Sequence, residues 1–183
     1  GVTFNQIGNV NLPSTNWTGA LNIIRAKAEL NNVRFQKILG EDALNTVDSK
    51  IISKNVLKFD DIQSDAFDSD FSNVIFDRII CEHVGNDCLD TSGSVVQGGF
   101  VKGHRIGDKL LSFGEKSNAH LVLANCSKCG IGVAVKDSSE VKIKSIEFYE
   151  TPLKLSVFKK KPFFREAILN INQLSSSIPR GEI

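Results

Sequence analysis

Aspartates recur along the chain at nearly constant spacing, and they are the residues with the clearest capacity for chemistry. A first series is Asp42, Asp65, Asp87 and Asp108, separated by 23, 22 and 21 residues. A second series follows three residues behind the first: Asn45, Asp68 and Asp90. If one structural unit repeats at this spacing, each series becomes a row of side chains in the fold.

Three roles are open to stacked carboxylates. Oxygen ligands one strand apart suit Ca²⁺, so we name Asp65, Asp87 and Asp108 as candidate metal ligands and Ca²⁺ as the possible cofactor. Carboxylates on adjacent coils can also act as an acid and a base. Aspartates in turns ordinarily accept hydrogen bonds from the backbone, and the sequence favours this structural role over the other two.

Lys109 directly follows Asp108, and the repeat places it near Asp87. A lysine in this position could act as a base, which makes Asp87, Asp108 and Lys109 the candidate catalytic residues. It could equally neutralise an otherwise costly row of acids, and the sequence favours this pairing. Glu115, Lys136 and Asp137 are expected close by, near the same turns.

Serines carry the most regular signal of the chain and identify the elements that position these aspartates. Ser49, Ser72, Ser94, Ser117 and Ser139 are separated by 23, 22, 23 and 22 residues, and Lys27 lies one period upstream. A fixed period of this length indicates units stacked on one another. The sequence therefore predicts an all-β fold, a right-handed parallel β-helix of about six to seven coils of about 22 residues each.

Short apolar runs with alternating polarity support this fold. Val141 to Phe148 shows the alternation best, and such runs are typical of half-buried strands. No proline lies between Pro13 and Pro152, as strands paired on both sides require. We expect a leading coil or cap over residues 1–20, repeats over 21–158, and a closing segment and tail over 159–183.

Cysteines and histidines add little chemistry to this picture. Cys81 and Cys126 are expected two coils apart, too far for a disulfide, and Cys88 takes the place of a small core residue. The sequence therefore predicts no disulfide, with a strained Cys126–Cys129 pair as the remote exception. Of the three histidines, only His83 and His104 are expected near each other.

Composition excludes some classes of function. The 183 residues carry a net charge of +1 and are 41% hydrophobic, which argues against a nucleic-acid partner. No apolar stretch is long enough to span a membrane. The chain contains no methionine and begins with Gly1, so we expect it to be fused to another domain in the full-length protein.

Two resemblances follow from the motifs. The stretch 85–94, with Gly107-Asp108 and Cys129-Gly130, resembles the polygalacturonase and pectate-lyase type of β-helix, in which carboxylates on adjacent coils hydrolyse glycosides. The resemblance ends at the reacting groups, because Lys109 replaces an aspartate and Cys129-Gly130 replaces a Gly-His-Gly motif. Polysaccharide lyases of this fold use a lysine or arginine base, which Lys109 could imitate.

The second resemblance covers most of residues 17–165. The stretches 41–45, 64–68, 86–90, 107–115 and 130–139 resemble the right-handed β-helix repeat domain of bacterial surface proteins that occurs beside CotH-type kinase-like domains. This resemblance implies an extracellular or cell-surface module that handles carbohydrate.

Three functional hypotheses remain after these arguments. The first is association with polysaccharide without strong catalysis. The second is a polysaccharide lyase, glycoside hydrolase or epimerase, and the third is a structural spacer that binds nothing. For the first, the candidate carbohydrate-binding residues are Asp65, Asp68, Asp87, Asp90, Asp108, Lys109 and Glu115.

Overall fold

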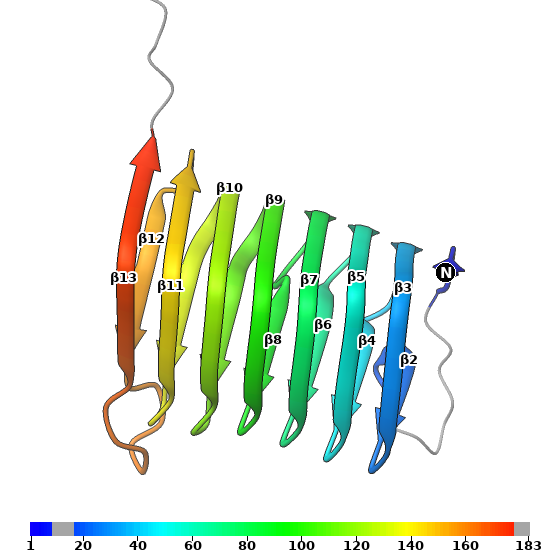
Figure 1. Ribbon diagram of the computed structural model, residues 1–183, viewed down its shortest axis with the longest axis horizontal. Helices are drawn as coiled ribbons and strands as arrows, with labels where there is room; N and C mark the ends of the chain where they lie inside the picture. Colours follow the sequence, from blue (N-terminus) through cyan, green and yellow to red (C-terminus); the bar gives the residue numbers. More distant parts are fainter. Residues whose placement is uncertain (9–16, 178–183) are drawn as a thin grey trace, which may run out of the picture.

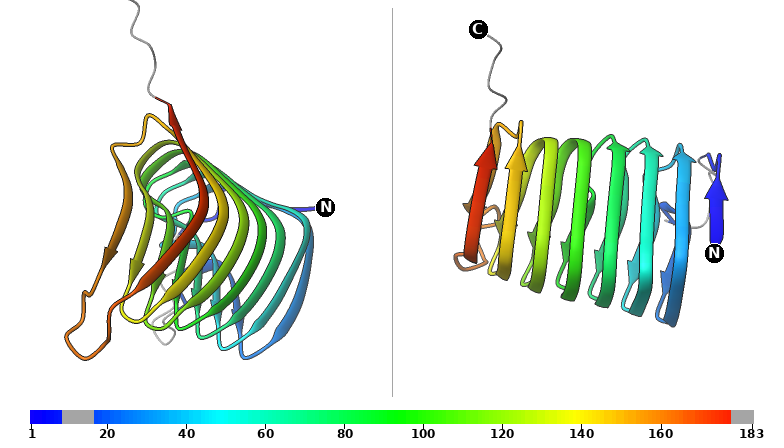
Figure 2. Two further views of the ribbon diagram at one scale, coloured as in Figure 1. Left: turned by 60° about the vertical axis from the view of Figure 1, so that its left-hand side comes forward. Right: turned by 45° about the horizontal axis from the view of Figure 1, so that its top comes forward.

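The chain folds into a parallel β-solenoid of about six turns, as the period predicts. The computed structural model describes residues 1–8 and 17–177, which contain thirteen strands and no helix. Every strand pair is parallel. Figure 1 shows the strands side by side in chain order, and Figure 2 shows the coils one behind another.

Two rows of strands form the walls of the solenoid. The first row contains β1 (Val2–Asn5), β3 (Lys27–Ile38), β5 (Lys50–Ile62), β7 (Asn73–Val84), the first part of β9 (Val95–Gly114) and of β10 (Asn118–Lys136), β11 (Glu140–Tyr149) and β13 (Ile168–Ser177). The second row contains β2 (Gly19–Ile24), β4 (Asp42–Val47), β6 (Asp65–Asp70), β8 (Leu89–Ser92), the later parts of β9 and β10, and β12 (Leu153–Phe158). Strands β9 and β10 run through both rows and join them into one sheet.

Left-handed residues form the corners at which each coil turns. One corner recurs at the same place in successive coils, with φ of 55° at His83, 56° at Arg105 and 56° at Lys128. Another recurs at Asp48, Phe71 and Gly93, with φ between 47° and 63°. Because these corners keep the same place, the strands between them stay in register from coil to coil.

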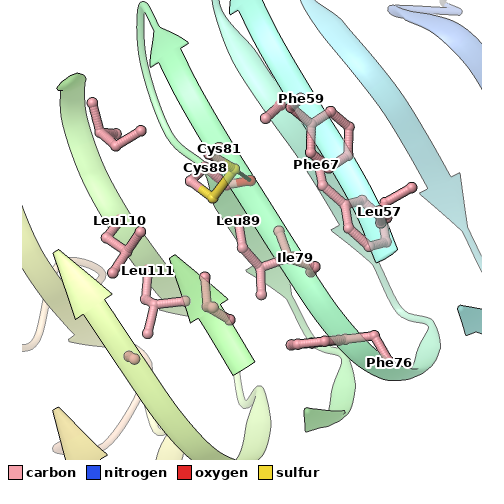
Figure 3. Packing of buried hydrophobic residues seen from close by; sticks show 14 of the residues in the cluster. Leu57, Phe59, Phe67, Phe76, Ile79, Cys81, Cys88, Leu89, Leu110 and Leu111 are labelled. Carbon is pink, nitrogen blue, oxygen red and sulfur yellow. Dashed lines mark hydrogen bonds between the residues drawn. A yellow bond between two sulfur atoms is a disulfide. The ribbon is translucent and has the colours of Figure 1, made fainter. Parts of the chain in front are cut away.

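Side chains of the same kind stack inside the solenoid. The rings of Phe4, Phe35 and Phe59 lie on one another, with centroids 4.9 and 5.1 Å apart. Figure 3 shows Phe59, Phe67 and Leu89 among the residues that fill the interior. Burying an aromatic or aliphatic side chain of this size stabilises the fold by about 1.5–3 kcal/mol.

The serine series forms a polar ladder beside this core. The Oγ atom of Ser72 accepts a hydrogen bond from the backbone N–H of Ser49 (3.0 Å), and that of Ser94 accepts one from Ser72 (2.9 Å). Ser117 and Ser139 continue the pattern. One period upstream, the Oγ atom of Ser49 accepts a hydrogen bond from the backbone N–H of Ala26. Lys27, the next residue, is the register partner of Lys50. The ladder therefore satisfies the backbone at a corner, which is a structural role.

The prediction of no disulfide is wrong. Cys81 and Cys88 form a disulfide within one coil, with their Cα atoms 5.9 Å apart, and Figure 3 shows it inside the solenoid. Cys126 and Cys129 form the second, which is the pair that the sequence analysis named as the exception. Cys81 and Cys126 are indeed two coils apart, since both pair with Gly103. The prediction failed because Cys88 was taken as a small core residue, whereas the corner at His83 brings it back to Cys81, seven residues earlier.

The C-terminal segment differs from the expected closing segment. Residues Ile168–Ser177 form β13, which pairs with β11 in parallel and adds another rung to the stack. Only the preceding loop folds back on the coils, where the backbone N–H groups of Lys160 and Lys161 donate to Asp137 Oδ1 at 2.8 Å. At the other end, β1 pairs with β3 and β2 pairs with β4. Residues 9–16 and 178–183 lie outside the described residues.

Candidate functional site

The candidate site lies on the outer face of β4, β6 and β8. Side chains alternate between the two faces of a strand, and Leu44, Phe67 and Leu89 are fully buried inside. The next residue on each strand therefore faces outward. Register places these outward residues on one line, which we call the outer row: Asn45, Asp68, Asp90 and Ser112. This confirms the predicted stacking of Asn45, Asp68 and Asp90.

A second line of polar residues, the flanking row, lies beside the outer row and contains Asp42, Asp65, Asp87 and Lys109. Asp42 pairs with Asp65. Asp87 and Lys109 stand two residues before the register partners Leu89 and Leu111. The prediction that Asp108 continues this row is wrong, because the register of β8 and β9 places Lys109 there and moves Asp108 one residue aside.

The flanking aspartates cap the backbone of the following coil. Asp65 Oδ1 accepts hydrogen bonds from the N–H of Asp87 (2.8 Å) and from Asn86 Nδ2 (2.7 Å). Asp87 Oδ1 accepts one from the N–H of Lys109 (2.9 Å). These contacts are the structural role that the sequence favours for its aspartates.

Lys109 is held between two carboxylates. Its ammonium lies 3.3 Å from Asp87 Oδ1 and forms a second ion pair with Asp108 Oδ2. Burial opposes the charge on Lys109, but the hydrogen bond to Asp108 and the charge of Asp87 outweigh it and raise the lysine pKa. The pairing of Lys109 with its neighbours is therefore present in the fold, and the lysine stays charged rather than serving as a free base.

Burial dominates the electrostatics of both rows. It raises the pKa of Asp68 to about 8 and the pKa of Asp42 to about 7. It also raises the pKa of Asp87 to about 7, although the Lys109 ammonium works against that rise. The pKa values of Asp65 and Asp70 shift upward for the same reason. Repulsion among these carboxylates adds to the effect.

Several acceptors of this face have no donor. Among the described residues, the side chains of Asp68, Asp70 and Asp90 take part in no hydrogen bond or ion pair. Asn45 Oδ1 and Asp90 Oδ1 are buried and likewise unpaired within this part of the chain. Sequence reasoning missed Asp70 and the open oxygen of Asn45. The alternation of Asp68 and Asp70 along β6 was a signal for the first, whereas the second depends on a side-chain orientation.

Glu115 and Lys136 are engaged with partners other than the aspartates of the two rows. Glu115 forms an ion pair with Lys161 at the corner that follows β9, and Lys136 Nζ donates to Ser112 Oγ at 3.2 Å. In residues 1–8 and 17–177, no group of three His, Cys, Asp or Glu side chains is arranged to hold a metal ion. The calcium hypothesis for Asp65, Asp87 and Asp108 therefore gains no support from the geometry.

Two histidines meet on another face of the solenoid, as expected. The rings of His83 and His104 lie 6.3 Å apart, centroid to centroid. His83 Nε2 is 3.2 Å from Arg105 Nη1, and His104 Nδ1 is 3.2 Å from Ser127 Oγ. The backbone N–H groups around Ser127 belong to a strand paired on both sides, so this Ser–His pair has no evident donors for an oxyanion.

Comparisons with protein-family models, with curated proteins and with solved structures find no match for this chain. The described residues also contain no helix long and apolar enough to cross a membrane.

Proposed function

We propose that this chain is a β-solenoid module of the cell surface or extracellular space that associates with an extended polysaccharide along β4, β6 and β8. The observation that carries the proposal is the pair Asp68 and Asp90. The two residues are register partners one rung apart, and both side chains are half-buried and make no hydrogen bond or ion pair with the described part of the chain.

The shape of the face suits a linear polymer. Parallel register repeats the same outward position about every 4.8 Å along the solenoid, a step of the same order as one sugar in an extended chain. Asp68 and Asp90, the half-buried members of the outer row, therefore offer carboxyl groups on two successive rungs, whereas Asn45 and Ser112 are buried. A polymer lying along the solenoid axis could contact both carboxyl groups with successive sugar units.

The chemistry of the face suits sugar hydroxyls. An ionised carboxylate only accepts hydrogen bonds, whereas a hydroxyl can donate. Hydrogen bonds between a neutral group and a charged one are roughly twice as strong as those between neutral groups. Asp65, Asp68, Asp70 and Asp90 make the face acidic, so the proposed polymer is neutral or cationic rather than rich in uronic acids. The pKa of Asp68 is raised to about 8, and a cationic polymer would favour the ionised form of this residue.

The geometry favours binding over catalysis. Asp87, a candidate acid or base, has a side chain only 3% exposed and bonded to Lys109, so it does not reach a polymer on the surface. Lys109 has its charge shared between two carboxylates. A lyase, hydrolase or epimerase mechanism would require these groups to leave their present partners.

Binding to a panel of immobilised neutral, amino-sugar and uronate polysaccharides tests the proposal. The informative variant is Asp68→Asn/Asp90→Asn, which keeps the side-chain shape and removes the charge. Glu140→Gln/Glu166→Gln is the matched control, because both glutamates are exposed and lie outside the two rows. We expect at least one neutral or amino-sugar polymer to bind, with about tenfold loss in the first variant only. Absence of binding to every polymer would instead indicate a spacer.

A further inference from the structure

The loop between β12 and β13 concentrates positive charge. In residues 159–166, which we call the basic loop, four of the eight residues are lysine or arginine and one is acidic. The whole chain has a net charge of only +1, so the remainder of the chain is net negative. Figures 1 and 2 show this loop extending past the corners of the neighbouring coils. A local excess of one sign of charge favours an oppositely charged partner.

The backbone of the basic loop is fixed to the solenoid at both ends. Near its start, the N–H groups of Lys160 and Lys161 donate to Asp137 Oδ1. Near its end, the N–H of Arg165 donates to Ser138 Oγ at 2.6 Å, and the N–H of Ser138 donates to the carbonyl of Arg165 at 3.0 Å. A loop that is already ordered loses little conformational entropy on binding.

The turn at the tip of the loop directs one phenylalanine outward. The N–H of Phe164 donates to the carbonyl of Lys161 at 3.2 Å, and Pro162 takes the second position of this turn, which its fixed φ favours. Phe164 is half-buried, and its ring lies 4.9 Å from the ring of Phe163 and 6.0 Å from the ammonium of Lys116. Phe163 is 78% exposed, more than any other large apolar side chain in the described part of the chain.

The charges around this exposed ring are not neutralised by acids. Three exposed cations of the loop form no ion pair within residues 1–8 and 17–177: Lys159, Lys160 and Arg165. Glu115, the acid that contacts the loop through a side-chain ion pair, is taken by Lys161. Glu166 alone cannot balance three cations. The loop therefore combines an apolar tip with uncompensated positive charge.

We propose that the basic loop docks this chain onto an anionic lipid bilayer. The Phe163 ring enters the boundary between headgroups and acyl chains, while Lys159, Lys160 and Arg165 contact anionic headgroups. Apolar insertion and basic residues are each weak membrane signals, and stable peripheral binding combines the two. A soluble polyanion would be matched by the cations alone and would leave the Phe163 ring in water. The loop lies outside the two rows, so this inference does not rest on the proposed polysaccharide contact.

Flotation of the whole chain with lipid vesicles tests this inference. The vesicles contain phosphatidylcholine alone, or phosphatidylcholine and phosphatidylserine in equal parts. Phe163→Ser removes the ring and keeps the charge, whereas Lys159→Gln/Lys160→Gln removes charge and keeps the ring. The matched controls change exposed residues outside the loop: Leu39→Ser, at a residue 59% exposed, and Lys27→Gln/Lys50→Gln on β3 and β5. Circular dichroism and a thermal melt establish that each variant is folded.

We expect the chain to bind the anionic vesicles, to leave the neutral ones unbound, and to bind less tightly as salt is added. Each loop variant should lose about tenfold in affinity, and neither control should. Insertion is measured with Phe163→Trp in a Trp17→Phe background. Its emission should shift to shorter wavelength on anionic vesicles and be quenched by brominated acyl chains.

Several results would overturn the inference. One is the absence of flotation with anionic vesicles. Another is full binding by Phe163→Ser without an emission shift in the tryptophan variant, because the cations alone would then recognise the anion. A dimer that Phe163→Ser abolishes, with no vesicle binding, would assign the tip to a second copy of the chain. Polysaccharide binding is measured separately, so the two proposals can fail independently.

Discussion

Asp68 and Asp90 are register partners on β6 and β8, and neither carboxylate is matched by a donor or a cation in the described part of the chain. Asp87 on the same face differs in this respect, because its Oδ1 atom lies 3.3 Å from the ammonium of Lys109. The face therefore contains one carboxyl group that is paired with a lysine and two that are not. Predictions about stability and binding follow from that difference.

Stability should depend on pH through Asp68. Its pKa is raised from 3.8 to about 8 by burial and by repulsion from Asp70, Asp42, Asp90 and Asp65. The folded state therefore holds a proton that the unfolded state has released, so stability is full below the unfolded pKa and is lost as pH rises through about 8. Asp42 acts in the same direction up to about pH 7. We expect a lower melting temperature at about pH 9 than at about pH 5.

Asp68→Asn should flatten this dependence and raise the melting temperature at alkaline pH. The amide keeps the shape of the side chain but carries no charge to be repelled. Thermal melts across the pH range check the prediction, with Glu140→Gln as the exposed control. Parallel pH profiles for the wild type and Asp68→Asn would contradict the electrostatic account of this face.

Asp87→Ala should destabilise the fold more than Asp108→Ala. The first change removes a buried acceptor from the backbone N–H and the ammonium of Lys109, which costs about 2 kcal/mol. The Asp108 side chain is 41% exposed, so its loss should cost less than about 1 kcal/mol. Urea unfolding measures both free energies, and equal costs would count against the capping role of Asp87.

Ser94→Ala should lower the free energy of unfolding by about 2 kcal/mol, because it leaves a buried N–H without its acceptor. The Oγ atom of Ser94 accepts from the N–H of Ser72 and donates to the carbonyl of Ser69, both at 2.9 Å. Ser145→Ala is the matched control on β11, where the side chain is half-buried. A similar small effect of both substitutions would show that the serine ladder is not a structural device.

Replacing Cys81 and Cys88 by alanine should reduce stability by about 2 kcal/mol, since the disulfide closes a short loop within one coil. Peptide mapping without reductant identifies the pair, and urea unfolding with and without reductant measures its contribution. Alkylation of both thiols in the untreated folded protein would contradict the pairing.

The solenoid could be predicted from the sequence because residues of the same type recur once in each coil. Serines, aspartates and alternating apolar residues return after each coil, and parallel register turns this return into rows. Asn45, Asp68 and Asp90 could therefore be aligned without a structure. The pairing of Lys109 could also be anticipated, because a lysine beside a row of acids has an obvious electrostatic role.

The features that sequence reasoning missed depend on single-residue geometry. Choosing Asp108 instead of Lys109 for the flanking row is an error of one residue, and register is set by buried Leu89 and Leu111 rather than by the acidic pattern. The Cys81–Cys88 disulfide depends on how the corner at His83 turns. The open oxygen of Asn45 depends on which way an amide points, and no pattern of residue types encodes that.

The most direct test of the central claim is an NMR titration of the labelled chain with a soluble oligosaccharide of the polymer that binds in the polysaccharide panel. We expect amide shifts to change on β4, β6 and β8, around Asn45, Asp68 and Asp90, while residues of β5 and β7 such as Lys54 and Arg78 stay unchanged. Shifts confined to the first row of strands would contradict the claim that the outer row is a binding face. The absence of any shift at the highest ligand concentration would contradict it as well.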